Sequence, residues 1–400
     1  MKKIKLFLML PLLLLVIVGL FGCEEKEDTL KIGYFGMLSE AGDCLVQRNT
    51  IKLFVEKWNN EGTFNGKKVE FIEYDNTNNG AQDTEMSIKA ANKLINQDGV
   101  DIIISAQLSN IIQATGQLIN DAEVIDIGLG LSATWMEQGW DYVYRTALNN
   151  DFQVPGIATT MKALNQKDVA LLYQNTDNCL TFKDAFKEEM NKQGINVIKE
   201  EMLSSDGGTG MTGQLTSAIN SNPDCIFITA MGGSFGTAVK QLRQLGYKGM
   251  IYLGQPLTTT EVDSIGVDEV NGVAMFSPYI VYKNVEDCKN EFCKSVLQSY
   301  YDKYGVCPQT DMIYKIWDAM LLIENAVLKA NSFDPTVIQP VIKTLKFQGC
   351  AGEMDFTQGS NECYFGARAW VYTGQGAAGG PTVLEDWLET PLADKIKKTK

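Results

Sequence analysis

The stretch Leu30-Lys31-Ile32-Gly33-Tyr34-Phe35-Gly36 has the composition of a buried strand that ends in glycine. The next apolar residues recur at the spacing of one helix face, and they are Ile51, Phe54, Val55 and Trp58. Gly62 ends that helix, and residues 69–74 form a second strand. A helical crossover between two strands predicts that the strands are parallel, because parallel strands need a connection of this kind.

The same alternation of strand and helix runs through the rest of the chain. Residues 101–105 form a short, largely apolar segment, which is typical of a central strand in a parallel sheet. After residues 142–146 the alternation starts afresh, and two long helices near 286–304 and 311–329 follow it. The expected strands are 30–36, 69–74, 101–105 and 124–127 in the first unit and 169–173, 225–230 and 250–254 in the second. The pattern predicts an α/β protein made of two Rossmann-like lobes with parallel sheets.

The first residues have the features of an export signal. Three lysines among the first five residues precede an uncharged apolar run at 6–21, which is short for a membrane span. Leu20-Phe21-Gly22-Cys23 looks like a bacterial lipobox, and an ordinary signal peptide with a chance cysteine is the alternative. We expect a lipoprotein signal peptide at 1–22, a lipid anchor at Cys23 and a polar tether at 23–29. The protein is then extracytoplasmic and held at a bacterial cell membrane.

Composition limits the functions that this chain can have. Of its 400 residues 45% are hydrophobic and 21% are charged, which is ordinary for a globular protein, and the length after the signal suits two cores. The formal net charge of −14 argues against nucleic acid or an anionic bilayer as a partner.

One residue type that catalytic sites commonly use is missing. Histidine is absent, which removes Ser-His-Asp triads, histidine-assisted cysteine nucleophiles and histidine-based zinc sites. The glycine-rich segments 207–210 and 232–233 match neither the Walker A nor the dinucleotide-binding pattern. We therefore expect no enzyme activity, no cofactor and no metal.

The cysteines leave the redox state open. Besides Cys23 the chain has eight: Cys44, Cys179, Cys225, Cys288, Cys293, Cys307, Cys350 and Cys363. An even number in an exported chain suggests disulfides, and a local bridge between Cys350 and Cys363 is one possibility. The alternative is that all eight remain thiols.

Short pieces of the chain match one protein family in order and spacing. They are Lys31-Ile32-Gly33 with Gly36-Met37-Leu38-Ser39, Trp58-Asn59-Asn60-Glu61-Gly62, Val69-Glu70-Phe71 with Tyr74-Asp75, Tyr144-Arg145-Thr146, Leu242-Arg243-Gln244-Leu245-Gly246, Trp317-Asp318-Ala319 and Glu353-Met354-Asp355-Phe356. Over residues 30–372 the chain thereby resembles the substrate-binding proteins of ABC importers for branched-chain amino acids. Those proteins have the type I periplasmic binding protein fold.

The resemblance implies an architecture and a mode of action. Three hinge crossings would join the lobes, near 146–150, 276–278 and 352–356. The lobes implied are an N-terminal lobe of 30–147 plus 277–352 and a C-terminal lobe of 148–276 plus 353–400. A small solute would be captured by hinge closure and passed to a membrane permease with its ATPase. The alternative role is a sensory module that reports the same ligand.

The resemblance also implies ligand contacts in the N-terminal lobe. The ligand carboxylate would be held by Ser109 after the third strand and by Ser132 after the fourth, or by Leu131 if the match shifts by one residue. Free N–H groups at a helix start, together with the helix dipole, form an anion site. The alternative is that Ser109 only caps its helix. The loop after the first strand adds Asp43, with Cys44 beside it.

In the C-terminal lobe the chain departs from the family pattern. Asn178, Met231 and Gln255 stand where amino-acid binders have a tyrosine, a further aromatic residue and the acidic partner of the ligand ammonium. Asp177 and Glu261 are near but do not match that acidic position. A buried ammonium without a carboxylate is costly. Two ligand classes therefore stay open: a branched-chain or related amino acid, and a small amide or a carboxylic or aromatic acid.

Overall fold

Strand β1 (Thr29–Gly36), from which the prediction started, lies inside a parallel sheet. In the computed structural model of the chain, the described residues are 29–39, 41–105, 107–204, 210–363, 367–374, 380–391, 393 and 396. The expected signal peptide and Cys23 lie outside them, as does the tether up to residue 28. Within the described ranges, no helix is both long enough and apolar enough to cross a membrane.

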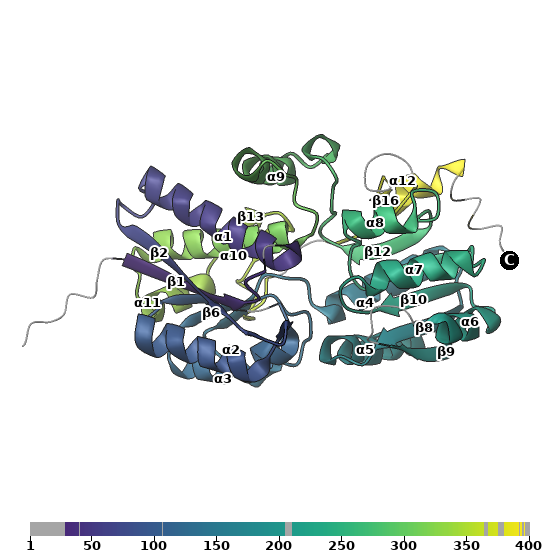
Figure 1. Ribbon diagram of the computed structural model, residues 1–400, viewed down its shortest axis with the longest axis horizontal. Coiled ribbons are helices and arrows are strands. Elements are labelled where there is room, and N and C mark those ends of the chain that lie inside the picture. The colour runs from purple at the N-terminus through teal and green to yellow at the C-terminus, as the bar shows by residue number, and fades with distance from the viewer. Residues whose placement is uncertain are drawn as a thin grey trace, which may run out of the picture.

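The first sheet has the strand order β2-β1-β5-β6-β7, and its neighbouring strands are parallel. Its other strands are β2 (Lys68–Asp75), β5 (Ile102–Ile104), β6 (Ile125–Gly128) and β7 (Val143–Arg145). The helices of this unit are α1 (Gly42–Glu61), α2 (Thr84–Lys93), α3 (Ser109–Asp121), α9 (Glu291–Tyr304), α10 (Met312–Ala330) and α11 (Pro335–Ile342). Ile102 and Ile104 share a core with α1 and α10, whereas Ile103 shares one with α2 and α3. Helices therefore cover both faces of the sheet (Figure 1).

Short elements complete this unit. They are β3 (Thr77–Asn78), β4 (Ala81–Gln82), β13 (Lys346–Gly349), β14 (Gly352–Asp355), the π-helical turn η1 (Leu94–Asp98) and the 3-10 turns η2 (Met136–Gln138) and η3 (Val285–Asp287). β3 pairs with β4 and β13 pairs with β14, each as an antiparallel hairpin.

The second sheet has the strand order β16-β15-β12-β11-β10-β8-β9. Its strands are β8 (Asp168–Gln174), β9 (Asn196–Leu203), β10 (Cys225–Thr229), β11 (Met250–Leu253), β12 (Val273–Ser277), β15 (Arg368–Val371) and β16 (Thr382–Val383). Its helices are α4 (Asn150–Ala163), α5 (Asp177–Gln193), α6 (Thr212–Asn220), α7 (Ser234–Gln244), α8 (Thr259–Ile265) and α12 (Leu384–Leu388). Ile226 and Ile228 pack with α6, α7 and α8, and Phe227 packs with α4, α5 and α12. The predicted α/β class with two Rossmann-like units is confirmed.

This second sheet contains strands that the apolar pattern did not predict. β9 lies at the edge of the sheet and pairs only with β8. Every second residue of this strand is exposed, so charged residues interrupt the apolar ones in Asn196-Val197-Ile198-Lys199-Glu200-Glu201-Met202-Leu203. β15 and β16 close the opposite edge as antiparallel strands. The sheet is therefore mixed rather than fully parallel.

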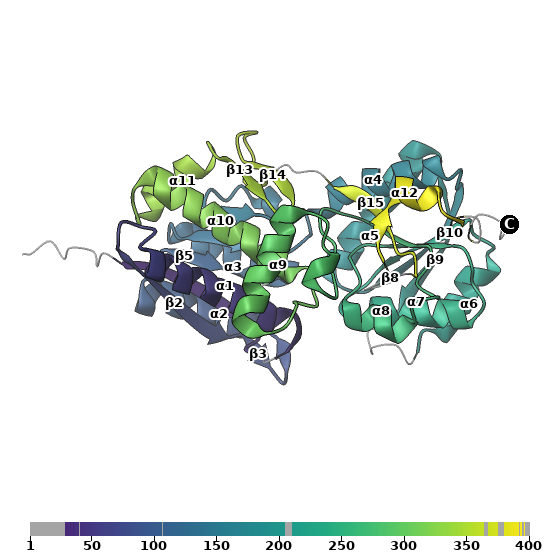
Figure 2. The ribbon, with the colours of Figure 1, turned by 90° about the horizontal axis from the view of Figure 1, so that it is seen from above.

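The two units lie side by side, joined by crossings of the chain (Figure 2). Arg145 ends β7 of the first sheet and Asn150 begins α4 of the second unit. Ser277 ends β12 of the second sheet, and Tyr279 is already part of the first core.

The third crossing lies later than expected. Met354, Phe356 and Cys363 are buried in the first core, whereas β15 pairs in the second sheet. The chain therefore passes over after Cys363, and residues 353–363, which we had expected in the C-terminal lobe, pack with the first unit. The reason is the β13–β14 hairpin, whose main-chain N–H groups at Cys350 and Ala351 donate to the buried carboxylate of Asp318 on α10, at 2.6 and 3.2 Å.

The eight cysteines of the described residues are buried, free thiols. A bridge between Cys350 and Cys363 is thus not present. Burial raises the pKa of both thiols well above the usual range, which keeps them protonated.

Asp126 in β6 is a carboxyl group buried inside the first unit. Its side chain is fully buried, on the opposite face of the sheet from Ile125 and Ile127, and its carboxyl oxygens have no hydrogen-bond partner within the described residues. Burial raises the pKa of Asp126 to about 7, because the ionised form loses its hydration. The folded state therefore favours the protonated acid.

We predict that Asp126→Asn stabilises the protein at pH 8. The folded-state pKa lies above the unfolded value of about 3.9, so the free energy of unfolding of the natural chain falls as pH rises between about 4 and 7. The full loss would be about 4 kcal/mol, and the asparagine side chain of the variant does not titrate. Denaturant unfolding across this pH range measures the difference, with Asp121→Asn at the exposed end of α3 as control. An identical pH dependence in the natural chain and the Asp126→Asn variant would contradict the prediction.

Candidate functional site

The residues predicted to contact a ligand all lie at the carboxyl ends of parallel strands. The structure places Asp43 after β1, Ser109 after β5, Leu131 and Ser132 after β6, Asn178 after β8, Met231 after β10 and Gln255 after β11. Carboxyl ends of parallel strands meet at one edge of a sheet, where α/β proteins bind ligands. Each unit thus collects its predicted residues at one edge.

Ser109 and Ser132 contact each other. Ser109 is the first residue of α3 and Leu108 is the N-cap, so Ser109 does not serve as the cap of its own helix. The Ser109 Oγ instead accepts a hydrogen bond of 3.2 Å from the Ser132 main-chain N–H, and both residues are buried. A Cβ at Gly130 would lie 2.7 Å from the Ser109 Oγ, so only glycine allows this close approach.

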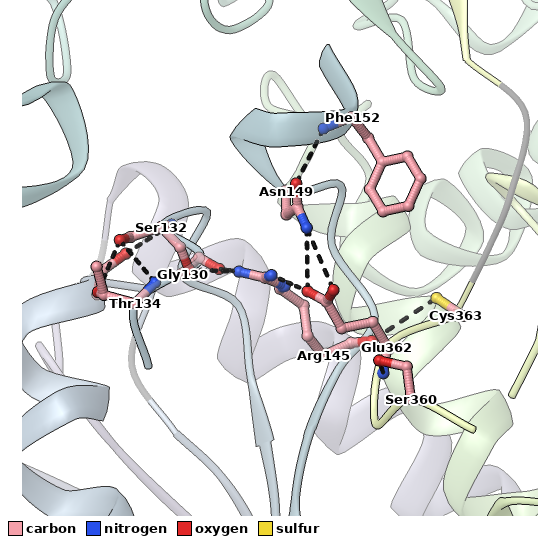
Figure 3. A network of polar contacts seen from close by, with 10 residues as sticks. Gly130, Ser132, Thr134, Arg145, Asn149, Phe152, Ser360, Glu362 and Cys363 are labelled. Atoms are coloured by element: carbon pink, nitrogen blue, oxygen red, sulfur yellow. Dashed lines mark hydrogen bonds and ion pairs between the residues drawn. The ribbon is translucent and has the colours of Figure 1, made fainter. Parts of the chain in front are cut away.

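A buried arginine holds the loop that carries Leu131 and Ser132 (Figure 3). The Arg145 Nη1 donates to the carbonyl oxygens of Gly130 and Ser132, at 3.2 and 2.6 Å. The Arg145 Nη2 pairs with the Glu362 carboxylate, and the guanidinium lies 4.8 Å from the ring centroid of Trp135. Arg145 is fully buried, and a buried charge needs a partner, which the Glu362 carboxylate provides.

The first crossing connects this loop to the second unit. The Asn150 N–H donates to the Leu131 carbonyl at 3.0 Å, and the Asn150 Nδ2 donates to the Asn178 Oδ1 at 2.9 Å. The Asn149 Nδ2 donates to both carboxylate oxygens of Glu362, at 3.2 and 3.3 Å. The Asn149 Oδ1 caps α4 by accepting from the Phe152 N–H. One short segment therefore contacts predicted site residues of both units.

A small pocket lies between the two units. Its walls are Leu131, Leu148, Gln153, Gln255, Pro256, Ser277, Pro278, Tyr279, Asp311 and Lys315. It brings Leu131 and Gln255, which we predicted from different lobes, into one site. Asp311 and Lys315 form a buried ion pair of 2.8 Å in its wall.

Asp43, Met231 and Glu261 have other surroundings. Thr310 donates to the Asp43 carboxylate, whose pKa is raised by burial and by the charge of Asp311. The Met231 N–H donates to the Gln174 Oε1 at 2.7 Å. None of the three is among the described residues that line the pocket.

Glu261 is occupied by hydrogen bonds to two helix starts. It accepts from the N–H groups of Thr258 at 2.9 Å and Gly236 at 3.0 Å. Burial raises its pKa, and the charge of Asp43 adds to that rise.

Sequence reasoning missed several polar residues of this region. Asn149, Asn150 and Gln153 stand in the first turn of a helix, where polar residues are common as caps, and their burial depends on how the units meet. Asp311 and Lys315 begin α10, four residues apart on one helix face. The clue in the sequence was the density of polar residues directly after a predicted crossing.

The arrangement suits binding by hydrogen bonds. Among the described residues no group of three or more cysteine, aspartate or glutamate side chains could hold a metal ion. Helix starts from both units, polar main-chain groups and buried amides surround the junction. Such groups can hold and orient a small polar solute.

We predict that Glu362→Gln destabilises the protein by about 3 kcal/mol, because the buried Arg145 charge loses its partner. Denaturant unfolding at pH 7 measures this loss. The double variant Arg145→Met with Glu362→Gln removes both charges and should recover part of it. If the loss of stability in the double variant equalled the sum of the losses in Glu362→Gln and Arg145→Met measured separately, the two residues would not be coupled.

Comparison with known proteins agrees with this geometry. Residues 29–377 match the family model described as periplasmic binding protein. The Leu/Ile/Val-binding protein homolog 3 of Brucella melitensis is 22% identical over 287 residues, covering 70% of this chain and 73% of that protein.

Solved structures share the fold. The branched-chain amino acid transporter substrate-binding protein LivJ of Streptococcus pneumoniae, solved with isoleucine, has a TM-score of 0.74 at 21% identity, covering 87% of this chain and 97% of that one. A solute-binding protein of an ABC transporter from Rhodopseudomonas palustris, solved with 3,4-dihydroxybenzoic acid, has a TM-score of 0.72 at 20% identity, covering 86% and 93%. The chain belongs to the periplasmic binding protein family, with the type I fold, and is a solute-binding protein rather than an enzyme.

Proposed function

We propose that this protein is the lipid-anchored, extracytoplasmic component of an ABC importer and captures a small amino acid between its two lobes. The observation that carries the proposal is the junction described above, where Leu131 and Gln255 line one pocket and Asn150 contacts both units. The names and ligands of the relatives support an amino acid of the branched-chain type. The membrane permease and its ATPase are the partners that this role requires.

Capture would start on the first unit and end with closure. The ligand carboxylate docks near Ser109 and Ser132, where the start of α3 offers N–H groups and the positive end of a helix dipole. The second unit then brings Asn178 and Gln255 towards it. The bonds from Asn149 to Glu362 are long for a charged acceptor, so hinge motion can break and remake them at small cost.

A second ligand class has an observation in its favour. Gln255 offers an amide where an acidic residue would pair with an ammonium, which suits a carboxylic or aromatic acid. The Rhodopseudomonas palustris structure contains such an acid on the same fold. A sensory role for the same ligand is the other alternative.

We predict that leucine, isoleucine or valine raises the melting temperature of the chain from Glu24 onward by a few degrees. At 100 times its dissociation constant, a ligand adds about 2.7 kcal/mol to the free energy of unfolding. Ser109→Ala should weaken binding by about tenfold, since the anion loses one hydrogen bond. Ser299→Ala on α9 is the control. If only 4-hydroxybenzoic acid raised the melting temperature, the ligand would belong to the second class. If neither this acid nor any of the three amino acids raised it, the proposal would be contradicted.

We predict that Cys23→Ser releases the protein from the membrane fraction of a bacterial host, because acylation needs the thiol. Labelling with a radioactive fatty acid followed by fractionation measures both effects. Fatty-acid labelling that persists in the Cys23→Ser variant would contradict a lipid anchor at this residue.

A further inference from the structure

We propose that Cys293 and Cys350 form a disulfide bridge that fastens α9 to the β13–β14 hairpin. The structure holds both residues as thiols, which is the reduced form of the pair. The inference rests on the proposed function in one respect: disulfides persist outside the cytoplasm, and the bridge needs that location. It assigns a covalent modification to one pair among cysteines whose redox state the sequence left open.

The two thiols lie in contact inside the first core. Cys293 is in the first turn of α9, and Cys350 directly follows β13, 57 residues later. The Cys293 Sγ donates to the Cys350 carbonyl at 3.5 Å, and the two thiols are also hydrogen-bonded to each other. Both are buried where α9 and the hairpin meet (Figure 2). A disulfide joins sulfur atoms about 2 Å apart, and side-chain rotation brings neighbouring thiols to that distance.

The backbone on each side of the pair is held in place. The Asn290 side chain caps α9 by accepting from the Cys293 N–H at 3.0 Å. The Cys350 N–H donates to the buried Asp318 carboxylate at 2.6 Å. A Cβ at Gly349 would lie 2.6 Å from the same carboxylate, so the hairpin needs glycine to approach it. These contacts do not involve the sulfur atoms, and they therefore remain when the thiols are oxidised.

Neighbouring thiols of the first unit have acceptors of another kind. They donate to main-chain carbonyls of residues other than cysteine: Cys288 to Asn290 at 3.4 Å, Cys307 to Tyr282 at 3.6 Å and Cys363 to Arg145 at 3.7 Å. Cys293, by contrast, donates to another cysteine. The contacts therefore pair Cys350 with Cys293, although Cys363 is nearer to it in the sequence.

The bridge forms by thiol–disulfide exchange, with a disulfide compound or a disulfide oxidoreductase outside the cytoplasm as the oxidant. One cysteine thiolate attacks a sulfur of the oxidant, whose S–S bond breaks, and the released half takes up the proton that the cysteine lost. The second cysteine, as a thiolate, attacks the protein sulfur of the mixed disulfide and releases the other half as a thiol. Two protein thiols are thereby oxidised, and one external disulfide is reduced to two thiols.

Burial determines when this reaction takes place. It raises the pKa of Cys350 well above the usual range, so the folded protein contains few thiolates at this position. Exchange is therefore slow once the core has closed, and it belongs to the folding of the newly exported chain. The packed core then selects the pairing, because a bridge between thiols in contact leaves the core undisturbed.

We expect the bridge to stabilise the first unit. It closes a loop that contains α10 and α11, which reduces the conformational freedom of the unfolded chain. The oxidised protein should melt about 5 °C or more above the same protein reduced with dithiothreitol. Reduction should leave the melting temperature of the Cys293→Ser variant unchanged.

The test refolds the chain from Glu24 onward, which contains every described residue, in a mixture of reduced and oxidised glutathione. Remaining thiols are alkylated with iodoacetamide, and the protein is digested with trypsin. Cleavage after lysine and arginine leaves Cys293 in residues 290–294 and Cys350 in residues 347–368. Mass spectrometry without reduction should find these two peptides joined.

Three variants identify the cysteines that take part. Residues 347–368 also contain Cys363, so the Cys363→Ser variant must keep the link and the Cys350→Ser variant must lose it. Cys307→Ser is the matched control, since the Cys307 thiol is buried in the same core and also donates to a main-chain carbonyl. The link must survive this substitution. Circular dichroism verifies that each variant is folded.

Alkylation of both Cys293 and Cys350 in the refolded protein overturns the bridge and leaves the importer role standing. A link to residues 347–368 that the Cys363→Ser variant lacks overturns it as well. A link that forms on refolding but is missing from the protein isolated from a bacterial host with an oxidising extracytoplasmic space supports the pairing and contradicts the proposed location.

Discussion

The buried guanidinium of Arg145 needs a counter-charge, and Glu362, from a segment far away in the sequence, supplies it. Removing two ions from water costs several kcal/mol for each, by order of magnitude, so the pair contributes mainly by fixing geometry. Its main-chain bonds fix the loop from Gly130 to Ser132, and Asn149 attaches the first crossing to the same carboxylate. The ligand loop and the hinge thus share one charged centre.

This centre also explains where the third crossing lies. The Arg145 N–H donates to the Asn361 carbonyl, and the Asn361 side chain donates to the carbonyl of Val143. Residues just before the third crossing are therefore paired beside β7, which leads into the first crossing. Two crossings that are remote in sequence lie together because one buried ion pair and its main-chain bonds hold them. Any hinge motion therefore moves residues that contact the ion pair of Arg145 and Glu362.

The sequence predicted the elements that depend on local pattern. β1 and β5 were found within one residue at each end, because they are apolar runs whose neighbours are parallel strands. β9 was missed because half of its residues face away from the core. The third crossing was misplaced because Glu353-Met354-Asp355-Phe356 reads as a strand in either unit, and the burial of Met354 and Phe356 depends on packing against α10. Strand ends located the candidate site, but the buried amides of Asn150 and Gln153 became visible only when the two units were seen together.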